Sequence, residues 1–173
     1  MASGKTTIGK YLAREIGAPF IDTDDLVVAR HGPIAAIFER HGEAGFRAAE
    51  FEAVRDALGG PPAVLALGGG AVTNPLTYAL LVARSLRVYL DVPAETILTR
   101  LHRSNTERPL AGRQPADAEV RALLAAREPL YRSSDLIVPG PHKTKRGYAV
   151  EIAERIRETA AMTGVRRVEA LAE

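Results

Sequence analysis

Apolar positions recur along the chain first with a helical period and then in short strand-like runs. Ile8, Leu12 and Ile16 stand four residues apart, and Gly17 follows them, which predicts a helix over 6–16 that ends at the glycine. Four apolar runs rich in strand-forming residues come at 19–21, 63–67, 86–90 and 135–138. The wide spacing between these runs leaves room for the helical crossovers that parallel strands require.

Helical patterns occupy several of the segments between these runs. In 43–58 one face is apolar and consists of Phe46, Ala49, Ala53, Val54, Ala57 and Leu58. Shorter helical patterns cover 96–101 and 118–126. Strands that alternate with helices predict an α/β fold with a parallel sheet and helices on both of its faces. We expect a single domain over 1–163 and a charged tail over 164–173.

The segment 103–117 has a different character. It is polar, contains a glycine and two prolines, and has no apolar period. Loops of this kind often close over a binding site, so we predict a mobile lid here.

Composition excludes several classes of function. Lys and Arg number 23 against 21 acidic residues, so the net charge of +2 argues against nucleic acid or a membrane surface as partner. The absence of cysteine rules out disulfides and thiolate metal sites. Residues 1–21 show no signal-peptide pattern, and no run approaches the roughly 20 apolar residues of a membrane span. We expect a cytoplasmic monomer. The histidines lack metal-ligand spacing and stand at His31, His41, His102 and His142.

The first seven residues match the second half of the phosphate-binding pattern G-x-x-x-x-G-K-[ST] and lead into the predicted helix. Backbone N–H groups and the helix N-terminus would hold a phosphate there. Lys5 would reach the β and γ phosphates of a nucleotide, and the Thr6 hydroxyl would bind Mg²⁺. The candidate nucleotide contacts are Ala2, Ser3, Gly4, Lys5, Thr6 and Thr7. The alternative is a Gly-Lys-Thr sequence that only caps a helix.

The first glycine of that pattern would precede Met1, and so would the buried strand that normally feeds such a loop. Neighbouring strands left without that partner would have unpaired backbone groups, at a cost beyond the about 5–15 kcal/mol by which a domain is stable. We therefore expect the natural start about ten residues upstream. The first strand of the fold would then be missing from this chain, and Met1 would be an internal methionine.

Two carboxylates follow the first predicted strand. The carboxyl ends of strands are where open α/β sheets bind ligands, and alternation sends Asp22 and Asp24 to the same side. One would hold Mg²⁺, directly or through water, while the other accepts a hydrogen bond or proton from an acceptor hydroxyl. We expect Asp25 to cap the next helix.

Arg47 stands between Glu43, four residues before it, and Glu50, three after it. Such spacing is typical of a solvated ion-pair ladder. Alternatively, Glu50 positions the guanidinium so that its fork grips a substrate carboxylate beside Phe46. The run Gly68-Gly69-Gly70 predicts close backbone approach to a ligand rather than a merely flexible turn.

Two further arginines are candidates for the site. Arg108, beside Pro109 in the predicted lid, would bring its charge onto the transferring phosphate when the lid closes. Arg127 is expected at a helix end, because Pro129 should turn the chain just after it. It would act either as a C-terminal cap or as a second clamp on a carboxylate.

Six segments together resemble the shikimate kinase family in order and spacing over 1–138. They are Gly4-Lys5-Thr6-Thr7, Asp22-Thr23-Asp24, 42–47, Gly68-Gly69-Gly70-Ala71-Val72, Arg108-Pro109-Leu110 and 127–131. The resemblance implies a P-loop kinase fold like that of the nucleoside monophosphate kinases. It also implies a five-stranded parallel sheet, a substrate region around the second and third helices, and a lid.

The resemblance also implies the reaction and its residues. With Mg²⁺ bound, the γ-phosphoryl group of ATP would be transferred to the 3-hydroxyl of shikimate. The products would be shikimate 3-phosphate and ADP, on the route to chorismate and aromatic amino acids. The implied catalytic residues are Lys5, Asp24 and Arg108; the implied shikimate contacts are Asp24, Arg47, Gly69 and Arg127; and the implied Mg²⁺ residues are Thr6 and, in the outer sphere, Asp22. Arg108 would also meet ATP.

Some features depart from the family pattern. Ala2 stands where glycine is frequent, and the stretch 139–146 differs from the family's usual sequence there. The adenine contact stays open between Arg100, Arg103 and Lys143. Two alternatives also remain: another small-metabolite kinase of this architecture, such as a gluconate kinase, and a non-catalytic relative that lacks its N-terminal strand.

Overall fold

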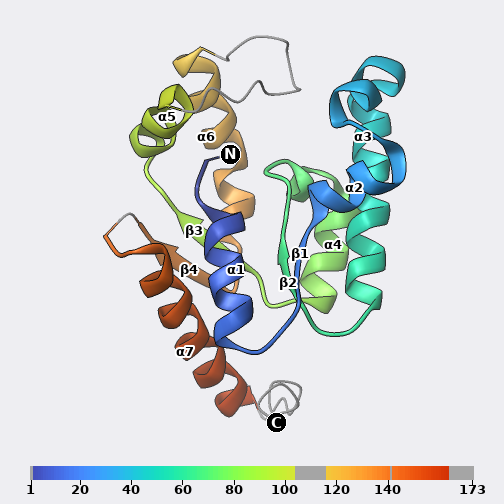
Figure 1. Ribbon diagram of the computed structural model, residues 1–173. Coiled ribbons are helices and arrows are strands. Elements are labelled where there is room, and N and C mark those ends of the chain that lie inside the picture. The colour runs from blue at the N-terminus through green and yellow to red at the C-terminus, as the bar shows by residue number, and fades with distance from the viewer. Residues whose placement is uncertain (1, 104–115, 141, 164–173) are drawn as a thin grey trace.

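A computed structural model describes residues 2–103, 116–140 and 142–163. Its helices are α1 Lys5–Glu15, α2 Thr23–His31, α3 Ile34–Gly59, α4 Pro75–Arg84, α5 Ala94–Arg103, α6 Asp117–Arg132 and α7 Lys145–Thr163. Its strands are β1 Phe20–Asp22, β2 Val64–Ala66, β3 Val88–Asp91 and β4 Leu136–Pro139. Each predicted strand run overlaps one of these strands, three of which end one residue later than predicted, and helices separate them (Figure 1). Arg108, most of the predicted lid and the predicted tail lie outside the described residues.

The strands pair in parallel, as the alternating pattern predicted, and form two pairs. Phe20 of β1 stands opposite Val64 of β2, and Val88 of β3 stands opposite Leu136 of β4. Within the described residues, no ladder hydrogen bonds join the β1–β2 pair to the β3–β4 pair. The site residues on the first pair and those near the second pair are therefore brought together by helix packing rather than by one continuous ladder.

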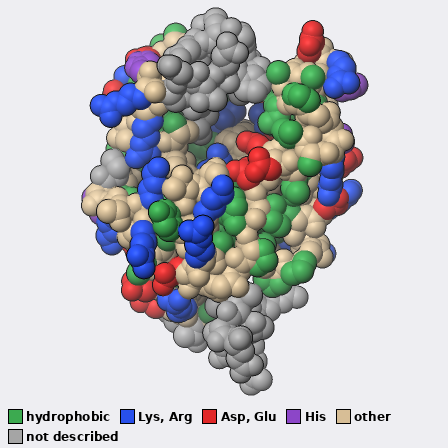
Figure 2. All heavy atoms as spheres, in the orientation of Figure 1, with side chains coloured by type: hydrophobic (Ala, Val, Ile, Leu, Met, Phe, Trp, Pro, Cys, Tyr) green, Lys and Arg blue, Asp and Glu red, His purple; other side chains and the backbone are tan. Residues whose placement is uncertain are grey.

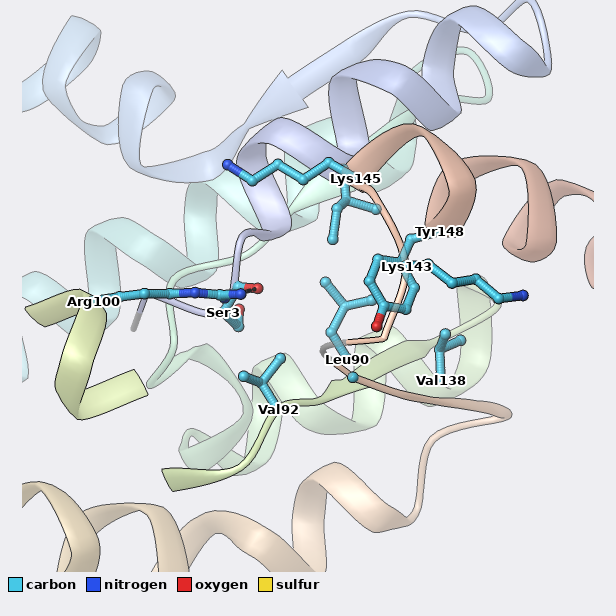
Figure 3. A pocket seen from close by; sticks show the side chains of 10 residues that line it. Ser3, Leu90, Val92, Arg100, Val138, Lys143, Lys145 and Tyr148 are labelled. Carbon is cyan, nitrogen blue, oxygen red and sulfur yellow. Dashed lines mark hydrogen bonds between the residues drawn. The ribbon is translucent and has the colours of Figure 1, made fainter. Parts of the chain in front are cut away.

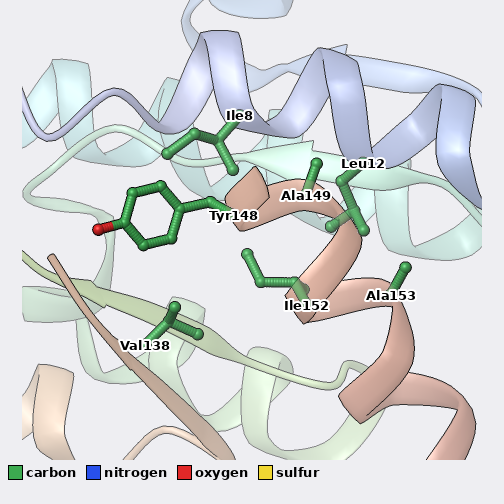
Figure 4. Packing of buried hydrophobic residues seen from close by; sticks show 7 residues of the cluster. All are labelled: Ile8, Leu12, Val138, Tyr148, Ala149, Ile152 and Ala153. Atoms are coloured by element: carbon green, nitrogen blue, oxygen red, sulfur yellow. The ribbon is translucent and has the colours of Figure 1, made fainter. Parts of the chain in front are cut away.

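Helix α1 holds the phosphate loop against the rest of the fold. Ile8 and Leu12 on its inner face pack on Tyr148 and Ile152 of α7 and on Val138 of β4 (Figure 4). The four-residue period of the apolar side chains in α1 is what allows these contacts, because it places them on one face. The position of the helix N-terminus is thus fixed by a buried core.

A second cluster joins α2 to α3. Val27 of α2 is completely buried against Phe46, Ala49 and Ala53, which come from the apolar face predicted for 43–58. Helix α3 is longer than the predicted segment, and its helical geometry is broken at Gly42, which has φ 63° and ψ −169°. Glycine suits this position because a positive φ strains other residues. The site-bearing half of α3 therefore begins directly after the break.

One predicted boundary is wrong. Helix α6 does not end at Arg127 but continues through Pro129 to Arg132. Pro129 lacks the N–H that would bond the carbonyl of Ala125, so the last turn is missing one helical hydrogen bond, but the helix nevertheless continues for three more residues. Arg127 therefore projects from within a helix, so it is not a terminal cap. Over the ranges that the structure describes, no helix combines the length and apolar character needed to cross a membrane.

Candidate active site

The phosphate loop turns sharply into α1. Gly4 precedes the helix with φ 98°, and Ala2 also has a positive φ, of 46°. Left-handed backbone in a loop that opens a helix directs successive N–H groups toward one point, which forms an anion-binding concavity. Arg100 of α5 secures this loop, because its Nη1 donates to the carbonyl oxygens of Ala2 and Ser3 at 3.0 Å each.

Thr6 and Asp22 meet at the mouth of the loop. The Thr6 hydroxyl donates to Asp22 Oδ2 at 3.0 Å, which ties the start of α1 to the end of β1. Asp22 Oδ1 accepts a hydrogen bond from the backbone N–H of Asp24 at 3.1 Å, so Asp22 is the cap of α2. The prediction that Asp25 caps this helix is wrong, because α2 begins immediately after the strand and Asp25 lies exposed in its first turn.

Asp24 lies beside the glycine turn that follows β2. Burial raises the pKa of its carboxyl group, the charge of Asp22 raises it further, and the charge of Lys5 opposes both. A Cβ atom on Gly68 would stand 3.0 Å from Asp24 Oδ1 and would collide with Glu50 Oε1. Only a residue without a side chain leaves room for both carboxylates here.

Arg47 lies between two carboxylates with different surroundings. Its Nη1 donates to Glu50 Oε2 at 2.7 Å, while Nε and Nη2 both donate to Glu43 Oε1, at 3.3 and 3.0 Å. Its side chain is 14% exposed, that of Glu50 1% and that of Glu43 65%. The contact with Glu50 is thus a buried pair and not a solvated ladder, as the second interpretation of the sequence required. Phe46 lies beside the guanidinium, with its ring centroid 5.2 Å from Arg47 Cζ.

Electrostatics within this pair depend on burial. Burial raises the pKa of the Glu50 carboxyl group, and the hydrogen bond and charge of Arg47 lower it, with a net rise. Burial alone would lower the pKa of Arg47, but its bonds to Glu50 and Glu43 outweigh that effect and the pKa is raised. The guanidinium therefore stays charged, as a carboxylate clamp requires.

Arg127 reaches the same glycine turn from α6. Its Nη1 donates to the carbonyl oxygen of Gly69 at 3.2 Å. Its Nε is buried and has no hydrogen-bond partner among the described residues. The guanidinium of Arg47 packs against Gly70, where an added Cβ atom would collide with it. Both arginines thus contact one run of glycines.

Two residues of the site carried no role in the sequence interpretation. The Tyr131 hydroxyl donates to the Gly69 carbonyl, and its ring stacks on Tyr89 at 5.3 Å between centroids. The fully buried Thr23 accepts from the Gly68 N–H at 3.3 Å and donates to the Ala66 carbonyl at 3.2 Å. The four-residue spacing from Arg127 to Tyr131 was the available signal for the tyrosine, since it puts both on one helix face.

A pocket lies beside the phosphate loop (Figure 3). Its walls are apolar side chains of α1, β3, β4 and α7, and its rim is basic. Arg100 and Lys143 line it together with Ser3, while Arg103 is not among its lining residues. Lys143 also pairs with Glu151 at 3.1 Å. Of the three candidates for the adenine contact, two therefore share one pocket.

The functional face is charged around its hollow. Figure 2 shows acidic side chains at the edge of the hollow in the middle of this face, with basic side chains near them. No group of three or more His, Cys, Asp or Glu side chains in the described ranges is arranged to hold a metal ion.

Known proteins resemble this chain over most of its length. The family model for shikimate kinase matches residues 1–160. Shikimate kinase from Halorhodospira halophila is 43% identical over 91% of this chain and 88% of its own length, and that from Geobacter sulfurreducens is 42% identical over 91% and 87%.

Solved structures agree with these matches. Shikimate kinase from Acinetobacter baumannii in complex with shikimate has a TM-score of 0.81 and 33% identity, covering 92% of this chain and 89% of its own. That from Aquifex aeolicus has a TM-score of 0.78 and 35% identity, covering 92% and 94%. With its parallel strands, phosphate loop and paired arginines, the chain belongs to the shikimate kinase family of ATP-dependent small-molecule kinases.

Proposed function

We propose that this chain transfers the γ-phosphoryl group of ATP to the 3-hydroxyl of shikimate and releases shikimate 3-phosphate and ADP. One observation carries the proposal: the guanidinium groups of Arg47 and Arg127 both contact the glycine turn beside which Asp24 lies. A small ring with a carboxylate at one end and hydroxyls at the other matches this arrangement. Its carboxylate would meet the arginines, and one hydroxyl would face Asp24.

The acceptor side of the reaction follows from these contacts. The buried Nε of Arg127, which has no described partner, is available to donate to a substrate carboxylate. Gly69 would place its backbone against the substrate between the two arginines. Asp24 would accept the proton of the attacking hydroxyl, and its raised pKa makes it a stronger base than an ordinary carboxylate.

The nucleotide side follows from the loop. The N–H groups of the loop and the side chain of Lys5 would hold the phosphates, and Arg100 would keep the loop in shape. Thr6 and Asp22 suit Mg²⁺, because a hydroxyl and a carboxylate oxygen already lie 3.0 Å apart and phosphate and water would complete the set. Bound Mg²⁺ would neutralise phosphate charge. Adenine would lie near Arg100 and Lys143, and Arg108 would act from the lid.

Release of ADP, measured with shikimate and separately with gluconate, tests the function. We expect release that depends on shikimate. No release with shikimate would overturn the proposed function, and faster release with gluconate would favour the rival kinase.

A further inference from the structure

Each of the three guanidinium nitrogens of Arg47 already donates a hydrogen bond to a carboxylate in this structure. Its inner nitrogen, Nη1, is held by Glu50, and its Nε and Nη2 both donate to one oxygen of Glu43. A carboxylate binds arginine best through two parallel N–H donors, and Nε with Nη2 is one such pair. Glu43 therefore occupies the Nε–Nη2 edge, one of the two-donor edges at which an incoming carboxylate would bind.

The two carboxylates are not equally replaceable. Glu50 is 1% exposed, and removing it from a buried pair would leave the arginine charge uncompensated. Glu43 is 65% exposed, so its contact is screened by water and can be exchanged at small cost. Of the two, Glu43 is the one that a ligand can displace.

The backbone break at Gly42 explains why Glu43 lies beside Arg47. The break at Gly42 makes Glu43 the first residue of the continuing helix, one turn before Arg47 and on the same face. A carboxylate at a helix start is favoured by the unpaired N–H groups there. After release from Arg47, Glu43 would keep this stabilisation, so displacement costs only its exposed pair with Arg47.

We propose that the Glu43 side chain occupies the site on Arg47 at which the substrate carboxylate binds. The substrate carboxylate displaces Glu43 on binding. This inference rests on the role of Arg47 proposed above. Glu43 then sets acceptor affinity, because part of the attraction between Arg47 and the substrate is offset by breaking the existing pair. It also affects selectivity. An acceptor without a carboxylate does not bind Arg47, so its affinity does not depend on Glu43.

The variant Glu43→Gln tests this, because it keeps the size of the side chain and removes its charge. The Kd for shikimate, measured by calorimetry, should fall about 1.5- to 5-fold, the range expected for an exposed ion pair. The Kd for methyl shikimate, which lacks the carboxylate, should not change. The KM for ATP should also stay the same.

Glu39→Gln is the matched control. Glu39 is exposed on the same helix, and the ion pairs recorded for Arg47 are with Glu43 and Glu50. This control removes the same charge, so a general electrostatic effect would lower the Kd for shikimate equally in both variants and would overturn the proposal. A higher Kd in Glu43→Gln would also overturn it, since Glu43 would then be supporting the clamp. Failure of the wild type to bind shikimate would instead count against the proposed function.

Discussion

The two arginines at the glycine turn have opposite surroundings. Arg47 on α3 is held by two carboxylates, one buried and one exposed, whereas Arg127 on α6 is held by a carbonyl oxygen and keeps a buried Nε without a described partner. Breaking a buried ion pair typically costs about 3–5 kcal/mol, because the remaining charge is left uncompensated. Loss of a hydrogen bond to a carbonyl costs roughly 0.5–1.5 kcal/mol. Arg47 should therefore matter for folding and binding, and Arg127 mainly for binding.

The variant Arg47→Ala should have the largest effect. It leaves Glu50 buried without its partner, so the free energy of unfolding should fall by about 3–5 kcal/mol in urea titration. The kcat/KM for shikimate should also fall, by roughly 10- to 150-fold, as expected for a lost charge-assisted contact of about 1.5–3 kcal/mol. The double variant Arg47→Leu with Glu50→Leu should recover stability but not activity. A single variant as stable as the wild type would contradict this account of the pair.

The variant Arg127→Ala should separate the two arginines. A similar fall in kcat/KM for shikimate is expected, again roughly 10- to 150-fold, with at most about 1.5 kcal/mol lost from the free energy of unfolding. Tyr131→Phe serves as its control, because it removes the other donor to Gly69 and leaves the guanidinium in place. Its kcat/KM should fall less than that of Arg127→Ala. If Arg127→Ala were as destabilised as Arg47→Ala, the distinction would be wrong.

A smaller effect concerns the aromatic stack of Tyr89 on Tyr131. Burial first, and then the charge of Asp91 and a hydrogen bond with it, raise the pKa of Tyr89 to about 12 from 10.0. The folded state therefore keeps this proton longer than the unfolded state does. The stabilisation is fully present below pH 10 and is lost as pH rises toward 12.

Tyr89→Phe should remove this dependence. The free energy of unfolding, measured from pH 9 to 12, should fall less steeply in the variant than in the wild type. Equal slopes would show that the Tyr89 phenol is not shielded by the fold. No comparable dependence is expected from Arg47, because its guanidinium stays charged throughout this range.

Much of this site could be predicted from the sequence because its signals are local. The spacing from Arg47 to Glu50 is three residues, which places both side chains on one helix face, and the structure confirms their contact. Asp22 ends β1, as the pattern predicted, but Asp24 is the second residue of α2, so the expectation that strand alternation sends the two acids to the same side is wrong. The roles of Arg108 and the lid stay predictions, since they lie outside the described residues.

Other features depended on where a helix begins or ends. The cap of α2 is Asp22 and not Asp25, because the helix starts without an intervening residue after β1. The missed helix α4 does carry a local signal, since Asn74 accepts from the N–H groups of Leu76 and Thr77 and Pro75 follows it. Boundaries are hard to predict because adjacent residues offer nearly equivalent caps, and small differences in packing select one.

The sequence by itself determined the kinds of group available, namely the phosphate loop, the paired acids, the glycine run and the arginines, since residue type and short spacing settle these. The tertiary structure decided how they are used. It buries Glu50, leaves Glu43 exposed, and brings Arg127 and Tyr131 to a carbonyl about sixty residues away in the chain. Burial and contacts between distant segments depend on how helices pack, and no local pattern contains that information.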